Sequence, residues 1–316
     1  MHKRSGPSQH RAVLGAILVC SVLLGWGGSA ATATASSQTV SRLQPGTIVT
    51  RDGLSAVVPP RGEGVGADAW LTGGGSISLR VQTRLDGRVR ITAAETPANA
   101  SSASTRRSGT SRHITATIKG SPPACQDQAH NLTGSWWRTT VNWSFKASST
   151  PTSLTQDAAG KAIKSGASHI THAFNDCGRA DHVSATSHYL GTTSLSPNIG
   201  SDSTCRNPDG HNVVGFGDLL GTQLGLTCWW FHGTTTVEAD MKLNKHDFNW
   251  TTTTVGCSNQ YVVQAVATHE FGHVFGLAHV SEANHGNLTM STSMFSCDNS
   301  PSTLGLGDML GLEARY

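Results

Sequence analysis

One short segment of the chain has the residue types and the spacing of a metal site that activates water. His269 and His273 are four residues apart, so on a helix they would lie on the same face, where two imidazoles can share one Zn2+. Glu270 follows the first histidine, and its carboxylate could therefore reach a water on the metal without binding the metal itself. Gly276 can adopt a positive φ, which would turn the chain and bring His279 round as a third ligand. Three protein ligands with an open fourth position are typical of a catalytic zinc site, whereas a structural site is closed by four.

These residues predict hydrolysis by a metal-bound water. Zn2+ on the three histidines would polarise a scissile carbonyl and lower the pKa of its bound water to about 7. Glu270 would act as the general base, taking the proton of that water and passing it to the leaving amine. The alternative is three ordinary histidines on a helix that binds no metal.

The pattern H-E-x-x-H-x-x-G-x-x-H of residues 269–279 resembles the signature of metzincins, which are zinc-dependent endopeptidases. Metzincins carry a methionine-containing turn after the third histidine. Met290, eleven residues past His279, supplies that methionine, and Met294 is the second candidate. In the family this methionine packs beneath the zinc and does not bind it.

Two further stretches resemble the matrixin branch of the metzincins. Residues 304–316 are similar to the last helix of matrixins, with an Asp, a Gly, an aliphatic residue and a final Tyr. Residues 237–244, followed by a Trp-Thr pair, are similar to the matrixin strand that precedes the active-site helix. The chain departs from matrixins at Ser291-Thr292, where they have Tyr-Pro. It also lacks the Pro-Arg-Cys-Gly type of motif that keeps matrixins inactive.

The resemblance implies an α+β fold. This would be a metzincin-type zincin domain with a mixed sheet, an active-site helix and a turn at Met290, preceded by a small β-rich segment. It also implies a substrate cleft in which residues 224–228 form the edge strand that pairs with an extended peptide. An exposed strand edge offers unpaired N–H and C=O groups to such a peptide.

Hydrophobic periodicity predicts the elements that would position the site. Strands are predicted at 136–145, 213–220, 225–231 and 235–243, and a helix at 154–174. The histidine motif and the matrixin resemblance imply two more helices, at 262–275 and 304–316. In the N-terminal segment, alternation over 76–83 and 88–92 with a turn signal at Asp86-Gly87 predicts a β-hairpin.

The N-terminus has the features of a secretory signal peptide over residues 1–35. A positively charged start is followed by an apolar run at 12–24 that is short for a membrane span, and Ala33-Thr34-Ala35 fits a cleavage site. A signal anchor is the alternative interpretation. No other segment is long and apolar enough to cross a bilayer, so we expect a secreted protein with no span in its mature form.

Seven cysteines become six once the signal peptide, which contains Cys20, is removed. An even number in an exported chain predicts three disulfides. The pairing of Cys257 with Cys297 is favoured, because these two flank the active-site helix and the Met290 turn. Cys125 is also expected in a disulfide. Metal binding is the alternative for the six, but the chain has no C-x-x-C pair.

Charge divides the mature chain into two parts. Residues 36–120 carry eleven Lys and Arg against five Asp and Glu, whereas residues 121–316 carry nine against fifteen. We therefore predict that 36–120 is a prosegment that docks by charge over the catalytic domain at 121–316. A flexible linker at 96–112, with the dibasic pair Arg106-Arg107, would allow its release. A nucleic-acid partner is not expected, since no Lys/Arg cluster is interleaved with aromatic residues.

The main functional hypothesis is a monomeric, secreted zinc endopeptidase that acts on protein or peptide substrates. The alternative is a secreted binding module at residues 36–95, carried on a weakly active or vestigial zinc domain. Asp202, Asp209 and Asp218 could help to bind Ca2+, although the same carboxylates suit a solvated loop.

Overall fold

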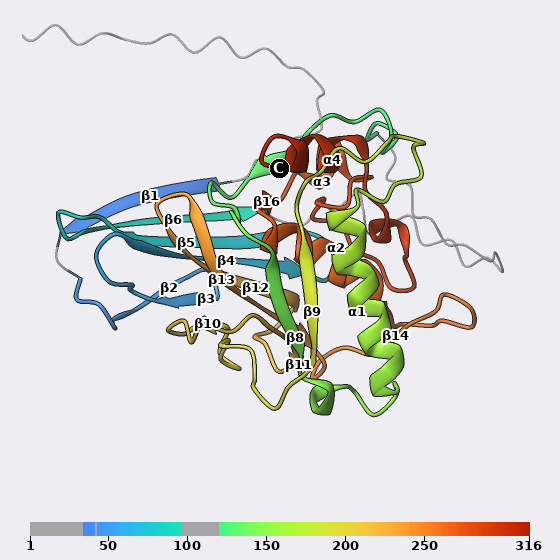
Figure 1. Cartoon of the computed structure of the whole chain (residues 1–316), viewed down its shortest axis with the longest axis horizontal. Helices are drawn as coiled ribbons and strands as arrows, with labels where there is room; N and C mark the ends of the chain where they lie inside the picture. The colour runs from blue at the N-terminus through green and yellow to red at the C-terminus, as the bar shows by residue number, and fades with distance from the viewer. Residues whose placement is uncertain (1–33, 42, 97–119) are drawn as a thin grey trace, which may run out of the picture.

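The computed structural model describes residues 34–41, 43–96 and 120–316 (Figure 1). The predicted signal peptide, apart from its last two residues, lies outside the described residues. So does most of the predicted linker, including Arg106 and Arg107. Within the described ranges, none of the helices has the length and apolar character needed to span a bilayer.

A mixed nine-stranded sheet runs through the molecule in the order β1-β6-β5-β4-β12-β13-β11-β8-β9. Its N-terminal half is antiparallel and consists of β1 (Thr34–Ser41), β4 (Glu63–Leu71), β5 (Ser76–Thr83) and β6 (Arg88–Thr96). The predicted hairpin is confirmed as β5 and β6. Gly87 has a φ of 82° in the turn between them, a conformation that glycine adopts without strain.

The C-terminal half of the sheet consists of β8 (Val141–Phe145), β9 (Ser187–Thr192), β11 (Val213–Gly217), β12 (Gln223–His232) and β13 (Thr235–Asn244). β12 and β13 are antiparallel, whereas β11, β8 and β9 all run parallel to β13. β8 begins later than predicted, since Trp136 forms an isolated bridge with Thr235 and does not continue the strand.

The two halves join where β4 pairs antiparallel with β12, from Leu71 opposite Gln223 to Glu63 opposite His232. The edge that the matrixin resemblance assigns to residues 224–228 is therefore not free, because β13 lies on one side of β12 and β4 on the other. This corrects the expectation of an exposed edge. A segment of the chain itself pairs with the N–H and C=O groups that an edge would leave open.

Alternation along β12 sends its side chains into two apolar cores, one on each face of the sheet. Trp229 and Phe231 belong to the core that also contains the helices, together with Trp70 of β4. Leu226 and Trp230 belong to the second core, which is formed largely by β4, β5 and β6. Because both halves of the sheet contribute to the second core, the β-rich segment packs as part of the same body as the predicted catalytic domain.

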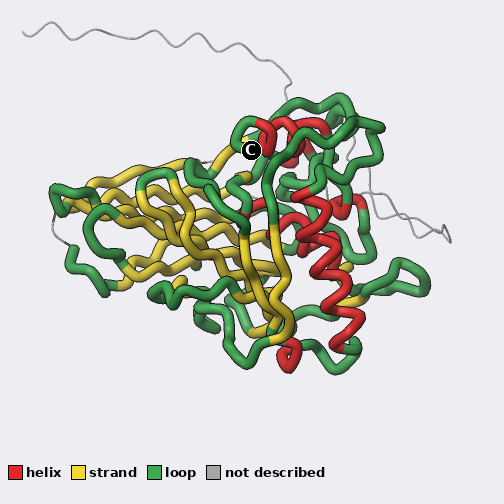
Figure 2. The backbone as a smooth tube through the Cα atoms, viewed as in Figure 1, coloured by secondary structure: helices red, strands yellow, loops and turns green. Residues whose placement is uncertain are grey.

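Two helices, α1 (Gln156–Thr171) and α2 (Val263–Val274), confirm the predicted helical segments. Figure 2 shows the helices gathered at the opposite side of the molecule from the N-terminal strands. Thr155 caps α1 by accepting a hydrogen bond from Ala158 N. A Cβ at Gly166 of α1 would lie 2.8 Å from Thr268 N of α2, so glycine allows the two helix backbones to approach closely.

Short elements complete the fold. β2 (Ile48–Arg51), β3 (Leu54–Val57) and β10 (Thr204–Cys205) form one small sheet, β14 (Trp250–Thr251) pairs with β15 (Tyr261–Val262), and β7 (Asn131–Leu132) pairs with β16 (Leu277–Ala278). Further helices are α3 (Glu282–His285) and α4 (Leu306–Glu313), with 3-10 turns η2 (Ala147–Ser149) and η3 (Ser300–Ser302).

Three disulfides link Cys125 to Cys177, Cys205 to Cys228, and Cys257 to Cys297. The favoured pairing of Cys257 with Cys297 is thereby confirmed, as is a disulfide at Cys125. A mixed sheet with few helices is also the α+β architecture that the sequence predicts.

Candidate metal centre

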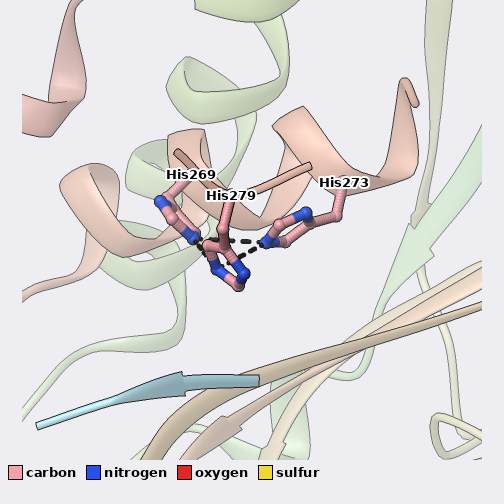
Figure 3. A group of neighbouring side chains, drawn as sticks. All are labelled: His269, His273 and His279. Atoms are coloured by element: carbon pink, nitrogen blue, oxygen red, sulfur yellow. Dashed lines mark hydrogen bonds between the residues drawn. The ribbon is translucent and has the colours of Figure 1, made fainter. Parts of the chain in front are cut away.

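The three histidines predicted to bind a metal converge in the structure. His269 and His273 lie one turn apart on α2, and His279 follows β16 (Figure 3). Their Nε2 atoms form a triangle with sides of 3.0, 3.1 and 3.2 Å. Nitrogen ligands of a tetrahedral zinc with bonds of about 2.0–2.1 Å are about 3.3 Å apart, so the triangle fits one Zn2+.

Hydrogen bonds at the far side of two rings fix their orientation. Nδ1 of His269 lies 2.7 Å from the carbonyl oxygen of Thr289, and Nδ1 of His273 lies 3.0 Å from that of Leu277. A carbonyl oxygen only accepts, so each Nδ1 carries the proton and each Nε2 keeps a free lone pair. Burial lowers the pKa of His273 to about 4 and the pKa of His269 well below its usual value. Both rings are therefore neutral at neutral pH, which is the form that binds zinc.

Glu270 is fully buried between α2 and β12. Its Oε2 accepts a 2.6 Å hydrogen bond from Oγ1 of Thr227 on β12. Its Oε1 is buried and has no hydrogen-bond partner among the described residues. Burial raises the pKa of Glu270 to about 8, and the bond from Thr227 opposes that shift. An unpaired buried oxygen at this position is an acceptor that a metal-bound water would satisfy.

Two glycines make room for this arrangement. A Cβ at Gly225 of β12 would collide with Oε1 of Glu270. Gly276 has a φ of 91°, as predicted, and a Cβ there would lie 2.7 Å from the carbonyl oxygen of Ser135. After this turn, Asn131 donates a 2.8 Å hydrogen bond to the carbonyl oxygen of His279. The turn and this bond bring the third histidine back towards α2.

Met290 is buried against α2, because a Cβ at Gly272 would collide with its Sδ. Asp308 of α4 holds the Met290 segment by accepting hydrogen bonds from Met290 N at 3.1 Å and Thr289 N at 2.8 Å. Burial raises the pKa of Asp308 to about 6, although these backbone donors oppose the shift. The methionine predicted to lie beneath the metal thus packs on the helix that carries two of the histidines.

Two residues that the sequence analysis did not single out, Asp68 and Trp70, lie against the histidines from β4. The Trp70 ring stacks on His269 with centroids 3.6 Å apart and an interplanar angle of 13°. Oδ2 of Asp68 lies 3.4 Å from Nδ1 of His273, and its Oδ1 lies 3.9 Å from Nδ1 of His279. Burial raises the pKa of Asp68 well above its usual value. Their separation by two residues, which places both on one face of a strand, is the signal that could have identified them.

A second group of side chains with metal-ligand spacing, Asp218, His246 and Asp247, is fully on the surface. Of the three aspartates considered for Ca2+, Asp218 belongs to this group. Asp202 and Asp209 instead accept hydrogen bonds from backbone N–H groups two residues further on, which is typical of aspartates in solvated turns.

An α+β fold that brings three histidines and a buried glutamate together around one helix has the architecture of a metal-dependent hydrolase. The family model described as matrixin matches residues 215–316, a segment that includes β12, α2 and all three histidines. This segment is therefore matrixin-like, as the motif at 269–279 predicts, and the match indicates a metalloprotease. β1 and β4 to β6 lie outside the matched residues. A search of curated proteins finds no match to the chain.

Proposed function

We propose that the chain is a secreted zinc-dependent endopeptidase with its catalytic centre at His269, Glu270, His273 and His279. The observation that carries this proposal is the Nε2 triangle next to the unpaired, buried Oε1 of Glu270. A glutamate at this position is not needed to hold zinc, but it can take a proton from a zinc-bound water. The matrixin match over 215–316 supports the same class of enzyme.

In this proposal the three Nε2 atoms hold Zn2+, which would polarise the scissile carbonyl and lower the pKa of its bound water. Glu270 accepts the water proton at Oε1 and delivers it to the leaving amine. Thr227 holds the other oxygen, Oε2, so the carboxylate cannot turn away from the reacting groups. A buried carboxyl ionises more readily beside a cation, so Glu270 becomes an effective base when the histidines are loaded.

Elements around the centre would bind and position the peptide. β12 would pair with an extended substrate through backbone hydrogen bonds only once β4, which covers its outer edge, has moved away. Met290 would support the ligand-bearing helix from below. The proposed substrate is therefore a protein segment or peptide in an extended conformation.

We retain the predicted organisation as part of the proposal: a signal peptide at 1–35, a prosegment at 36–120 and a catalytic domain at 121–316. Three disulfides are compatible with an extracellular location. The shared second core does not favour a binding module at 36–95 that folds by itself, because its side chains pack against Leu226 and Trp230 of β12. Release of 36–120 as a prosegment would uncover these two side chains.

The N-terminal segment is attached to the rest of the chain differently from the predicted docking by opposite net charge. β4 meets β12 through a backbone ladder, and the two segments share an apolar core. Among the described residues, the carboxyl–histidine contacts that cross this junction are those of Asp68 with His273 and His279, and burial lowers the pKa of both rings, which disfavours their charged form. Backbone pairing and burial therefore support the attachment more than the opposed net charges do.

Zinc binding and peptide cleavage test the proposal. Titration of the full chain against a competing chelator should give one high-affinity Zn2+ site, and His279→Ala should weaken it sharply. The matched control is Asp247→Asn in the exposed cluster, which should leave zinc affinity unchanged. An unchanged affinity in His279→Ala would place the third ligand elsewhere. Cleavage of a mixed peptide library should stop when the chelator is added, and cleavage that persists would contradict a zinc mechanism.

A further inference from the structure

β12 is paired on both sides from Gly225 to His232, although it is the strand expected to receive a peptide. β4 lies antiparallel to it without a gap between Trp230 and Cys228, where Val65 and Ala67 are the opposing residues. This is the geometry in which an extended peptide adds to a strand edge. β4 is thus a segment of the chain in the position of a bound peptide.

The facing side chains of β4 and β12 are matched in size. A Cβ at Gly66 would collide with the ring of Trp229, and a Cβ at Gly64 would collide with the ring of Phe231. Neither glycine has the positive φ that would by itself require glycine. Close approach of the aromatic rings is therefore the reason for glycine at these two alternate positions.

Further along the same face of β4, the side chains become large and lie on the metal centre. Asp68 contacts two of the histidines and Trp70 stacks on the third. With β4 in place, His269 and Glu270 have no exposed surface. A peptide cannot reach Glu270 until this strand moves.

Two features of the contact between β4 and β12 and of the neighbouring strand β5 are consistent with a β4 that can be displaced. The indole N–H groups of Trp70 and Trp229 are buried without a hydrogen-bond partner among the described residues. Burial of an unpaired N–H destabilises a packed state. The neighbouring strand is held by Arg80, which donates to the carbonyl oxygen of Thr133 and lies 3.8 Å over the ring of Phe231.

We propose that the edge of β12 is a groove for an extended peptide with glycine at two alternate positions, and that β4 occupies this groove and keeps the metal centre closed. The glycines of the bound peptide would face Trp229 and Phe231, on the N-terminal side of the residues over the histidines. This inference rests on the proposed endopeptidase function and names its substrate class and the segment that blocks it.

The test uses the zinc-loaded full chain and the rate at which zinc passes to a chromogenic chelator. Gly66→Val overpacks the contact with Trp229 and should accelerate zinc transfer by about ten- to a hundredfold, the range expected from overpacking. Adding Trp229→Gly to Gly66→Val removes the collision and should return the rate most of the way to that of the wild type. Hydrogen exchange of the β4 amides should follow the same order. A transfer rate and β4 protection in Gly66→Val equal to the wild type would overturn the proposal.

A second variant, Asp68→Ala with Trp70→Ala, decides the question if Gly66→Val does not fold. This variant keeps the β4–β12 ladder but removes the two side chains over the histidines. It should accelerate zinc transfer without increasing peptide cleavage, because the groove stays occupied. Zinc transfer at the wild-type rate would show that these residues do not close the centre and would overturn the proposal.

A mixed peptide library separates this proposal from the proposed function. Peptides cleaved by Gly66→Val should carry glycine at two alternate positions on the N-terminal side of the cleaved bond. Equal cleavage of peptides with bulky residues there would overturn the glycine rule. Accelerated zinc transfer with no cleavage of any peptide would support the occupied groove and contradict the endopeptidase. If the wild type cleaves peptides as fast as Gly66→Val while its β4 amides stay fully protected from hydrogen exchange, the endopeptidase would be supported and the occupied groove contradicted.

Discussion

β6 and β12 belong to the same sheet but show different burial patterns. Exposed or half-buried residues alternate with buried ones along β6, because one of its faces is open to solvent. β12 is buried at every position except its last, because the helices cover one face and the second core covers the other. β4 has the pattern of β12, with exposure limited to its two ends.

This difference shows that the N-terminal hairpin and the buried centre of the sheet are not divided at the same place in the sequence and in the structure. By sequence position β4 belongs with the N-terminal hairpin, but its burial pattern is that of the central strand β12. The residues that bind the proposed metal and the residues that cover it come from opposite sides of the β4–β12 junction. The experiments below therefore change either the residues proposed to bind the metal and activate water or the residues of β4 that cover them.

The largest effect is expected from Glu270→Gln, which removes the base and keeps the ligands. In the Gly66→Val background, peptide turnover should fall by about a thousandfold or more, since general base catalysis contributes about 10²–10⁴-fold. Zinc content, measured on the same preparation, should stay at the level of the parent. Turnover equal to that of the parent would assign the base to another residue.

Trp70→Ala tests whether the N-terminal half of the sheet covers the metal centre, because the Trp70 ring stacks on His269. The residue is fully buried, so the free energy of unfolding should fall by about 3–5 kcal/mol, measured by denaturant titration. Trp250→Ala is the matched control, because Trp250 is equally buried but lies away from β4. Both variants should lose stability, but Trp70→Ala alone should accelerate zinc transfer to a chelator. Equal acceleration in the control would mean that zinc escapes through global unfolding.

Asp308→Asn tests the support of the Met290 segment through pH. Burial raises the pKa of Asp308 from 3.8 to about 6, so the folded state holds a proton that the unfolded state has released between these values. Stability contributed by this group is therefore lost as pH rises from about 4 to above about 6, by about 3 kcal/mol in total. Asparagine does not titrate, so the stability difference between the wild type and Asp308→Asn should shrink by about that amount over this range. A difference that is constant from pH 4 to 7 would contradict the raised pKa.

The smallest effect is expected from salt. If β4 is held by backbone pairing and burial, zinc transfer from the wild type should change less than about twofold between about 0.1 and 1 M NaCl, although the screening length falls from about 10 to about 3 Å. A strong acceleration by salt would restore docking by opposite charge as the main attachment.

Much of the candidate site was predictable because its information is local. The spacing of His269 and His273 fixes their common helix face, and the turn at Gly276 has the predicted positive φ. The periodic segments of α1 and of the β5–β6 hairpin were predictable for the same reason. Cys257 and Cys297 were paired correctly from their positions on either side of the helix.

β4 was not predicted as a strand in its own right, and the reason is physical. Gly64 and Gly66 weaken strand propensity and interrupt the apolar alternation that identifies a strand. The reason for glycine at these positions lies in the folded structure, where the rings of Phe231 and Trp229 fill the space that a Cβ would take. Those aromatic residues lie more than 150 positions away in the sequence, so no local pattern connects them.

The sequence by itself determined the candidate ligand set, the candidate base and the turn that returns the third histidine, because each depends on spacing within about three helical turns. The tertiary structure alone decided that Thr227 holds Glu270, that Asp68 and Trp70 lie over the histidines, and that β12 has no free edge. These contacts join residues far apart in the chain. They arise from strand register and from the fit of side chains across a sheet, which only the folded chain defines.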